Sequence, residues 1–404
     1  MDRAAQNRAI LIICVSVFMM ALDYSMLNIS LPAVASRFGA DMSAIKWLPI
    51  IYMAIMTMLF LVSGRLGDIR GHSKIFIWGL SIFTVGTFLC GFSANLAVLI
   101  AFRSFQAVGE AMYSPMSVAI ITTLLPMGSR GKALGFLAMS QGVGFCAGPA
   151  LGGFLNTHFG WQAIFFVNVP IGIAVIASAV RLLPAGTTAA SPERVFDFSF
   201  FRNMDFTYAF ASAVLAISTV VGVSFMGPFY FEAARGIDIS RAGFILTLPS
   251  LAMLVTAPFS GWMADRFGGR PVCMAGMFLA TLSFAAFSFV GSGTPMAHLV
   301  ASFMLLGAAM GVFVPANNKL VMSLAPMDRQ GAASGLYKIA LNLAGIAGIA
   351  AFTAAISRVP GNGAAAVEGA FRGAFFLGVV ISSLAFVFAA LARDPAAVDK
   401  AWQL

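Results

Sequence analysis

Residues 64–71 read GRLGDIRG, and residues 261–270, which begin 197 positions further on, read GWMADRFGGR. Both stretches combine glycines with acidic and basic residues, and each lies between two long apolar runs. A second pair of similar stretches follows at an offset of 200, with PMGSRGKALG at 126–135 and PMDRQGAASG at 326–335. Two echoes at nearly one offset indicate a duplicated unit, which is how many transporters are built.

Apolar segments fill the chain around these polar stretches. Of the 404 residues, 60% are hydrophobic and only 10% are charged, whereas a soluble domain carries about 25% charged residues. A helix needs roughly 20 apolar residues to cross a bilayer. This composition excludes soluble enzymes, nucleic-acid-binding proteins and secreted disulfide-rich domains, and it predicts an all-α membrane protein. The predicted spans are twelve in number: 9–36, 47–64, 75–94, 97–125, 132–155, 162–183, 205–231, 241–262, 271–291, 296–322, 331–357 and 367–392.

The charges between the spans predict the orientation of the chain. Most of the 24 Lys and Arg residues fall in loops on the side of the N-terminus. Short loops rich in Lys and Arg stay in the cytoplasm, so both termini are predicted to be cytoplasmic, in a bacterial inner membrane. The longest polar stretch, at 184–204, separates six spans from six. It is predicted to be a cytoplasmic linker between a bundle at 1–183 and a bundle at 205–404.

Several motifs resemble those of the major facilitator superfamily. GRLGDIRGHSK at 64–74 is similar to the loop between its spans two and three, and keeps Gly64, Asp68 and Gly71. RSFQAVGEAMYSP at 103–115 resembles its span-four motif, which contains an intramembrane arginine. The resemblance implies a fold of two pseudo-symmetric six-helix bundles. It also implies transport by alternating access.

Other motifs resemble the DHA2-type drug:proton antiporters within that superfamily. GFCAGPALGG at 144–153 matches the antiporter pattern Gly-x-x-x-Gly-Pro-x-x-Gly-Gly, and LDYSMLNISLP at 22–32 and WQAIFFVNVPIG at 161–172 resemble two further motifs of the branch. Two features depart from it: the branch usually has fourteen spans, and it usually has a small residue at the position of Glu110. Gly-Glu-Ala at that position is more similar to organic-anion symporters of the superfamily.

The resemblance also assigns mechanical roles. Glycines spaced by four residues let helices approach closely, and proline bends a helix; in the family the span-five motif seals the outer gate. The residues implied in this gate are Gly144, Gly148, Pro149 and Gly152. An inter-bundle latch is implied for Arg65 and Asp68, together with Asp265 and Arg266 in the echo of that loop. Ordinary positive-inside loop charge is the alternative.

Asp23 is predicted to couple transport to protons. A carboxylate in mid-span costs roughly 2.5–3.5 kcal/mol, so it must be paired, hydrated or protonated. Ser16, Asp23 and Ser30 fall on one helical stripe, which indicates that the carboxylate faces a cavity. The alternative is a structural hydrogen bond to a neighbouring helix.

Span four carries the densest set of intramembrane polar residues. Arg103, Gln106, Glu110 and Ser114 share one helical face. Arg103 and Glu110 lie two turns apart, close enough to feel each other's charge in a low dielectric. A movement that changes their approach would release or take up a proton, so both are predicted to act in proton coupling. A permanent salt bridge is the alternative.

Substrate is predicted to bind in a central cavity. Two lysines, Lys319 and Lys338, fall within spans of the C-terminal half, where Lys319 can snorkel to the interface. Lys338 shares a stripe with Asn342. The residues predicted to line the cavity are Asp23, Met26, Gln106, Glu110, Ser114, Phe225, Met226, Tyr230, Lys338 and Asn342.

These observations predict a proton-coupled secondary transporter, most simply an antiporter that exports small amphipathic compounds. The alternative is a proton-coupled symporter that imports an organic anion. A membrane sensor or lipid flippase of the same fold is a weaker alternative. The chain lacks a Gly-x-x-x-x-Gly-Lys-[Ser/Thr] nucleotide-binding motif. We expect no enzyme activity, no metal site, no cofactor beyond the proton gradient, no nucleic-acid partner and a monomer in the lipid bilayer.

Overall fold

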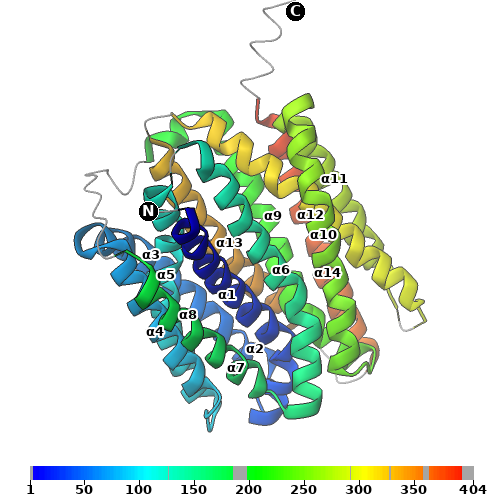
Figure 1. Cartoon of the computed structure of the whole chain (residues 1–404). Helices are drawn as coiled ribbons and strands as arrows, with labels where there is room; N and C mark the ends of the chain where they lie inside the picture. The colour runs from blue at the N-terminus through cyan, green and yellow to red at the C-terminus, as the bar shows by residue number, and fades with distance from the viewer. Residues whose placement is uncertain are drawn as a thin grey trace, which may run out of the picture. The chain divides into compact units, whose positions relative to one another are not determined.

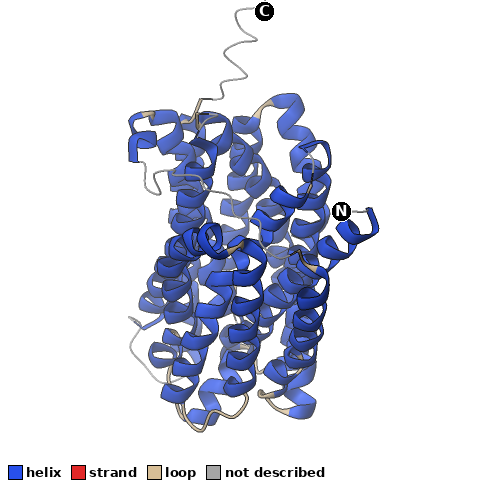
Figure 2. Cartoon of the chain, turned by 60° about the vertical axis from the view of Figure 1, so that its left-hand side comes forward, coloured by secondary structure: helices blue, strands red, loops and turns tan. Residues whose placement is uncertain are grey.

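The fold was obtained as a computed structural model, which describes residues 3–125, 127–184, 198–291, 293–326, 329–357 and 364–393. These residues form helices, and no strand occurs among them (Figure 2). Most of the predicted linker, residues 185–197, lies outside the described residues. The chain divides into two compact units, which are Met1–Pro192 with Ile239–Phe244 and Glu193–Asp238 with Ile245–Leu404.

The helices follow one another in the order shown in Figure 1. The N-terminal half contains α1 (Arg3–Phe38), α2 (Met42–Ile45), α3 (Trp47–Arg70), α4 (His72–Cys90), α5 (Leu96–Leu124), α6 (Met127–Phe159), α7 (Ala163–Phe166) and α8 (Asn168–Leu182). The C-terminal half contains the 3₁₀-helix η1 (Phe198–Arg202), α9 (Met204–Phe229), the π-helix η2 (Tyr230–Ala234), α10 (Ile239–Phe267), α11 (Gly269–Ser288), α12 (Met296–Leu324), α13 (Gln330–Ser357) and α14 (Ala364–Leu391).

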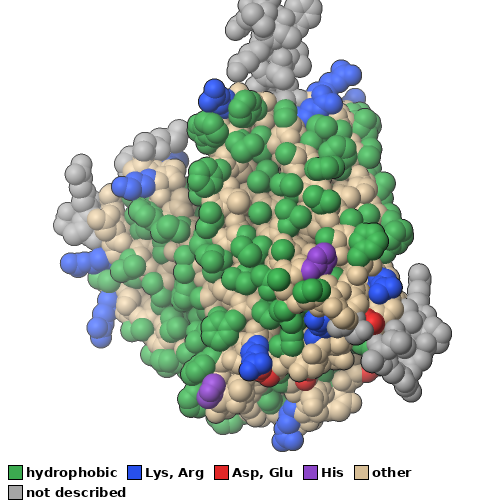
Figure 3. Space-filling view, turned by 90° about the vertical axis from the view of Figure 1, so that its right-hand side faces the viewer, with side chains coloured by type: hydrophobic (Ala, Val, Ile, Leu, Met, Phe, Trp, Pro, Cys, Tyr) green, Lys and Arg blue, Asp and Glu red, His purple; other side chains and the backbone are tan. Residues whose placement is uncertain are grey.

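The predicted fold class, an all-α membrane protein of twelve transmembrane helices, is confirmed. Among the described residues, eleven helical segments are long and apolar enough to cross a membrane. The remaining span is α5, which has 29 residues but a lower hydropathy because it carries Arg103, Gln106 and Glu110. Hydrophobic side chains are spread over the whole face shown in Figure 3, as expected of a surface that faces lipid.

Two short predicted spans are longer in the structure. The apolar runs at 47–64 and 241–262 continue as helix through the polar echo motifs, to Arg70 and Phe267. Gly71 then adopts φ +93° and Gly268 adopts φ +90°, a conformation that glycine adopts without strain. These two turns lie 197 positions apart, which is the offset of the sequence echo.

Two other spans differ in regularity from the prediction. The segment predicted at 162–183 consists of α7 and α8, which meet at Val167. Helix α9 contains Pro228 and passes into the π-helix η2. Proline removes one backbone hydrogen bond, and the wider π turn directly after it is a common way to accommodate such a break.

Small residues bring helices together at matching places in each half. Between α4 and α5, a Cβ built on Gly79 would lie 2.7 Å from the carbonyl oxygen of Gly109. Between α11 and α12, a Cβ built on Gly276 would lie 3.0 Å from the carbonyl oxygen of Ala309. In a bilayer, helices associate through such close packing and through hydrogen bonds rather than through a hydrophobic driving force.

Candidate functional site

A buried ion pair joins α1 to α5. The Arg103 Nη1 atom lies 2.7 Å from the Asp23 carboxylate, and the two residues expose only 1% and 3% of their surface. The partner of Asp23 therefore lies on another transmembrane helix, α5. Ser16 and Ser30, on the same predicted stripe, donate to the carbonyls of Ile13 and Met26 on their own helix.

Gln106 holds both members of this pair. Its side-chain oxygen accepts a hydrogen bond of 2.5 Å from Arg103, and its amide nitrogen donates to Asp23 at 3.2 Å and to the Thr87 hydroxyl at 2.6 Å. Thr87 in turn donates to the carbonyl of Phe83 on α4. Helices α1, α4 and α5 thus share one hydrogen-bonded set, which fixes the orientation of the guanidinium.

Glu110 belongs to the same buried region but has a different partner. The Tyr52 hydroxyl on α3 donates a hydrogen bond to the Glu110 carboxylate, and the Tyr52 ring lies 4.2 Å from the Arg103 guanidinium carbon. Tyr52 and Glu110 are both buried. One face of the tyrosine therefore contacts the cation, while its hydroxyl contacts the second carboxylate.

The buried charges of this region do not balance when all of them are ionised. Three acidic or basic residues of the types Asp, Glu, Lys and Arg are buried among the described residues: Asp23, Arg103 and Glu110. They supply two carboxylates and one guanidinium. The Arg103 Nε atom is buried and has no hydrogen-bond acceptor. The guanidinium thus keeps an unused donor, and one proton on either carboxyl group would make the set neutral.

The predicted gate motif packs α6 against α1. Cβ atoms built on Gly144, Gly148 and Gly152 would collide with Phe18, Ser25 and Met26 respectively. The Ser25 hydroxyl also donates to the Phe145 carbonyl across this contact. Met26, predicted to line the substrate cavity, lies fully buried here. The structure thus gives these glycines close packing, and their role as a gate stays a prediction.

The predicted latch residues have partners within their own halves. Asp68 lies 3.0 Å from His72 Nε2, and Asp265 lies 2.5 Å from Lys319 Nζ. The Arg266 guanidinium carbon lies 5.5 Å from the Trp262 ring, and Arg65 is exposed. These contacts lie within each half, so the latch between the halves stays a prediction.

The cavity residues predicted in the C-terminal half differ in their surroundings. Phe225, Met226 and Tyr230 are buried, and the Tyr230 ring lies 5.2 Å from Phe371. Lys338 and Asn342 are half-buried, and the Asn342 amide nitrogen is a buried donor without a hydrogen-bond partner. Ser114 on α5 is likewise half-buried.

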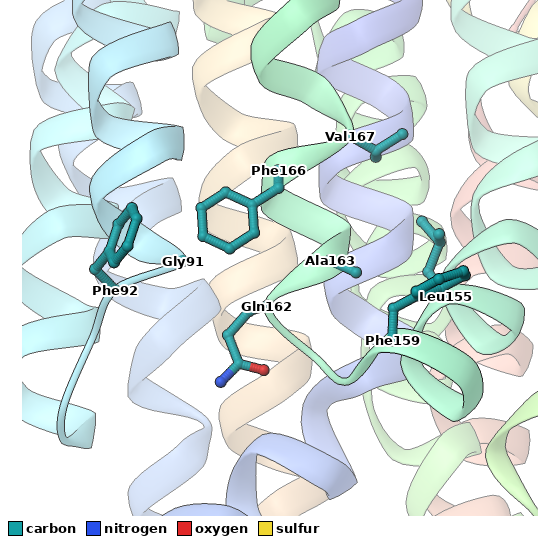
Figure 4. A pocket seen from close by; sticks show the side chains of 8 residues that line it. All are labelled: Gly91, Phe92, Leu155, Phe159, Gln162, Ala163, Phe166 and Val167. Carbon is teal, nitrogen blue, oxygen red and sulfur yellow. The ribbon is translucent and has the colours of Figure 1, made fainter.

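Two cavities lie away from these residues. One, of about 570 Å³, is lined by Gly91, Phe92, Leu155, Phe159, Gln162, Ala163, Phe166 and Val167. Figure 4 shows Phe92 and Phe166 toward one side of it and Leu155 and Phe159 toward the other. The second, of about 500 Å³, lies along α1 and α8. Neither cavity includes Asp23, Arg103 or Glu110. The described residues hold no group of three or more His, Cys, Asp or Glu side chains arranged for a metal ion.

Comparison with known proteins assigns the chain to a family. The sequence profile of the Major Facilitator Superfamily matches residues 13–238 and 208–402, which together cover most of the chain. The protein belongs to the Major Facilitator Superfamily. It is therefore a multi-pass membrane transporter and not an enzyme.

The names of two relatives mention different compounds. The riboflavin transporter RibZ of Clostridioides difficile is 30% identical over 395 residues, which cover 85% of this chain and 87% of that protein. The tetracenomycin C resistance and export protein of Streptomyces glaucescens is 24% identical, over 84% of this chain and 74% of that protein.

Solved structures show the same fold. A bacterial homologue of the human lysosomal transporter Spinster, in an inward-facing and occupied conformation, gives a TM-score of 0.81 at 17% identity and covers 97% of each chain. The nucleoside transporter NupG gives a TM-score of 0.76 at 13% identity, over 96% of this chain and 100% of that chain. At these identities the likeness concerns the superfamily fold alone.

The structure pairs the intramembrane charges differently from the prediction. The prediction placed Arg103 against Glu110 on one helix, whereas the structure pairs Arg103 with Asp23 and Glu110 with Tyr52. Neither Tyr52 nor Thr87 was predicted as a site residue. A polar side chain inside an apolar run was the available signal, but helical spacing does not say which neighbouring helix such a side chain contacts.

Proposed function

We propose that this transporter is a proton-coupled antiporter that exports small amphipathic compounds. The observation that carries the proposal is the buried set of two carboxyl groups and one guanidinium, Asp23, Glu110 and Arg103. An uncompensated charge at mid-bilayer costs roughly 2.5–3.5 kcal/mol. One proton makes the set neutral, and loading or unloading that proton changes its charge.

The geometry supports a way to exchange this proton. Arg103 is paired with Asp23, and its Nε atom still has an unused hydrogen-bond donor. Its guanidinium also lies against the ring of Tyr52, whose hydroxyl donates to Glu110. A helix movement that brings the guanidinium closer to Glu110 would weaken its hold on Asp23, so the proton would move from one carboxyl group to the other or leave. Alternating access supplies such a movement.

Export is favoured by the names of two relatives. One is the tetracenomycin C resistance and export protein, and another is the multidrug resistance protein Stp of Mycobacterium tuberculosis, which is 23% identical over 79% of this chain. Inward proton flow releases roughly 2.3 kcal/mol per charge per 100 mV. That is enough to drive export of a neutral or singly charged solute against a concentration gradient.

A second candidate is proton-coupled import. The relative at 30% identity is named a riboflavin transporter, and the Gly-Glu-Ala sequence around Glu110 resembles organic-anion symporters of the superfamily. Import and export make opposite predictions about proton movement, so one assay distinguishes them.

The test uses inside-out membrane vesicles that contain the protein and have an acidic lumen, with lumenal pH followed by a fluorescent dye. Ethidium, riboflavin and benzoate are added in turn. Antiport predicts a prompt loss of the pH gradient on addition of a transported compound. Asp23→Asn and Glu110→Gln are expected to abolish this proton release, whereas Glu232→Gln, a matched change at an exposed glutamate, leaves it intact.

The outcomes separate the candidates. A pH gradient that responds to none of the three compounds, or that responds equally in the Asp23 and Glu110 variants, would contradict the proposal. Proton movement in the same direction as riboflavin or benzoate would establish symport instead. The Tyr52→Phe variant keeps the ring on Arg103 but removes the bond to Glu110. It is therefore expected to shift the pH at which transport is half-maximal.

A further inference from the structure

A narrow apolar groove runs along two helices of the N-terminal half that contact each other, α1 and α8. It has a volume of about 500 Å³, and its walls are almost entirely aliphatic. The lining residues are Leu11, Ile12, Val15, Pro170, Ile171, Ala174, Val175 and Ser178. Neither the proton-coupling set nor the predicted gate uses this groove.

The surroundings of the groove are also apolar and exposed. Leu11 exposes 63% of its surface, Ile173 exposes 58% and Val180 exposes 62%. In a transmembrane helix such side chains face lipid, because water would make their exposure costly. The groove therefore opens to the bilayer, and its aliphatic walls match the chemistry of an acyl chain.

Two arginines extend the walls of the groove at the same end. On α1, Arg8 precedes Ile12 by four residues and Val15 by seven, so the three side chains lie on one face. On α8, Arg181 follows Ser178 by three residues and Ala174 by seven, again on one face. On each helix, the arginine thus lies on the face that lines the groove, one turn beyond the last lining residue.

The antiparallel course of the helices brings these two extensions together. Helix α1 runs away from the N-terminus and α8 runs back toward that end, so Arg8, near the start of α1, and Arg181, in the last turn of α8, lie at the same end of the groove. Both side chains are exposed. Both also stand where an apolar run meets polar sequence, which is the level of lipid headgroups.

The charge at this mouth is positive on every helix that forms it. Helix α8 contains no acidic residue, and the acidic residue of α1 is Asp23, which is paired with Arg103. A negatively charged group at the mouth would therefore meet arginines and no carboxylate from these elements.

We propose that this groove binds an anionic phospholipid. The phosphodiester pairs with Arg8 and Arg181, where the planar guanidinium groups match phosphate oxygens in bidentate geometry. One acyl chain lies in the groove between α1 and α8. A basic cluster at the mouth of an intramembrane groove is the arrangement that recognises acidic lipid headgroups.

Native mass spectrometry of the full-length protein in detergent tests this site. Phosphatidylglycerol and phosphatidylcholine with identical acyl chains are titrated separately, and the dissociation constant of the first bound lipid is compared. We expect the wild type to bind phosphatidylglycerol at least about tenfold more tightly. Arg8→Ala/Arg181→Ala should lose that preference, and Arg8→Lys/Arg181→Lys should keep most of it.

Two further comparisons separate the groove from general surface charge. Arg202→Ala/Arg270→Ala removes the same charge at two other exposed helix-end arginines and should leave the preference unchanged. Ala174→Trp fills the groove and should weaken phosphatidylglycerol binding, whereas Ala177→Trp, at an exposed position of α8 outside the lining, should not. Equal affinity for the two lipids in the wild type would overturn the proposal, as would a preference that survives Arg8→Ala/Arg181→Ala or binding that Ala174→Trp leaves unchanged.

Discussion

The two halves of the chain have matching helices but bury different side chains between them. The offset of 200 matches Pro115 in α5 to Pro315 in α12, and it matches Arg103 to Phe303. Arg103 lies against Asp23, Gln106 and the Tyr52 ring. Phe303 lies within an aromatic group, 4.6 Å from Phe287 and 5.6 Å from Phe231 between ring centroids.

This difference indicates a division of labour between the duplicated halves. Both need close helix packing, and both have it at equivalent glycines. The N-terminal half buries two carboxyl groups, Asp23 and Glu110, beside the guanidinium of Arg103, and these are the groups that we propose exchange a proton. The aromatic group at the equivalent place in the C-terminal half has no ionisable side chain. A duplicated scaffold can therefore keep its backbone geometry while only one copy carries the chemistry.

The largest effect is expected from Arg103→Leu. Removing one member of a buried ion pair leaves the other charge unpaired and costs about 3–5 kcal/mol of stability, so we expect a marked fall in the melting temperature of the purified protein and loss of transport. The double variant Asp23→Asn/Arg103→Leu removes both charges and should recover much of the stability without transport. If the single variant melts like the wild type, Asp23 is not held by Arg103.

Phe303→Ala tests the other side of the comparison. Truncating a buried phenylalanine costs about 3 kcal/mol through lost packing and a cavity, so the melting temperature should fall here too. Because Phe303 carries no charge, the number of protons moved per substrate molecule should stay that of the wild type, as measured from parallel proton and substrate fluxes. A changed ratio would show that the aromatic group takes part in coupling.

A smaller effect is expected from replacing Gly148 or Gly348, two glycines that lie 200 positions apart. A methyl group at Gly148 would meet the Ser25 side chain, whereas one at Gly348 would meet the Ser218 backbone carbonyl. Each glycine-to-alanine change is expected to cost about 1–3 kcal/mol. Ser25→Gly should rescue Gly148→Ala in thermal unfolding, while Ser218→Gly should give no rescue of Gly348→Ala because the carbonyl remains. Equal rescue in both halves would contradict this packing.

The smallest effect concerns Lys319, which pairs with Asp265 at an exposed position. The side chains of Lys319 and Asp265 are 47% and 73% exposed, and exposed ion pairs contribute about 0–1 kcal/mol. Lys319→Ala should therefore leave the melting temperature within a degree or two of the wild type. A large loss of transport with normal stability would instead assign the lysine a functional role.

Much of the fold could be predicted from the sequence because membrane spans are long and uniform. The twelve apolar runs and the echo of 64–71 in 261–270 are both visible in the order of residues along the chain. The break between α7 and α8 and the π-helix at Tyr230–Ala234 were not predicted, since both are backbone adjustments inside apolar sequence that shows no change in hydropathy.

The site was predictable as a set of residues and not as a set of pairs. Asp23, Arg103 and Glu110 are conspicuous because charge is costly in a bilayer. Their partners lie on other helices, at separations such as 80 residues for Arg103 and Asp23 and 58 for Tyr52 and Glu110. One-dimensional spacing carries no information about which helix faces are neighbours, so these contacts required the structure.

The deep burial of the charged set also shields it from dissolved salt. Asp23, Arg103 and Glu110 each expose at most 6% of their surface, so ions dissolved in the surrounding water do not reach them in this conformation. Salt screens a buried ion pair much less than an exposed one. Raising the salt concentration should therefore weaken the exposed pair of Lys319 with Asp265 more than the buried pair of Arg103 with Asp23.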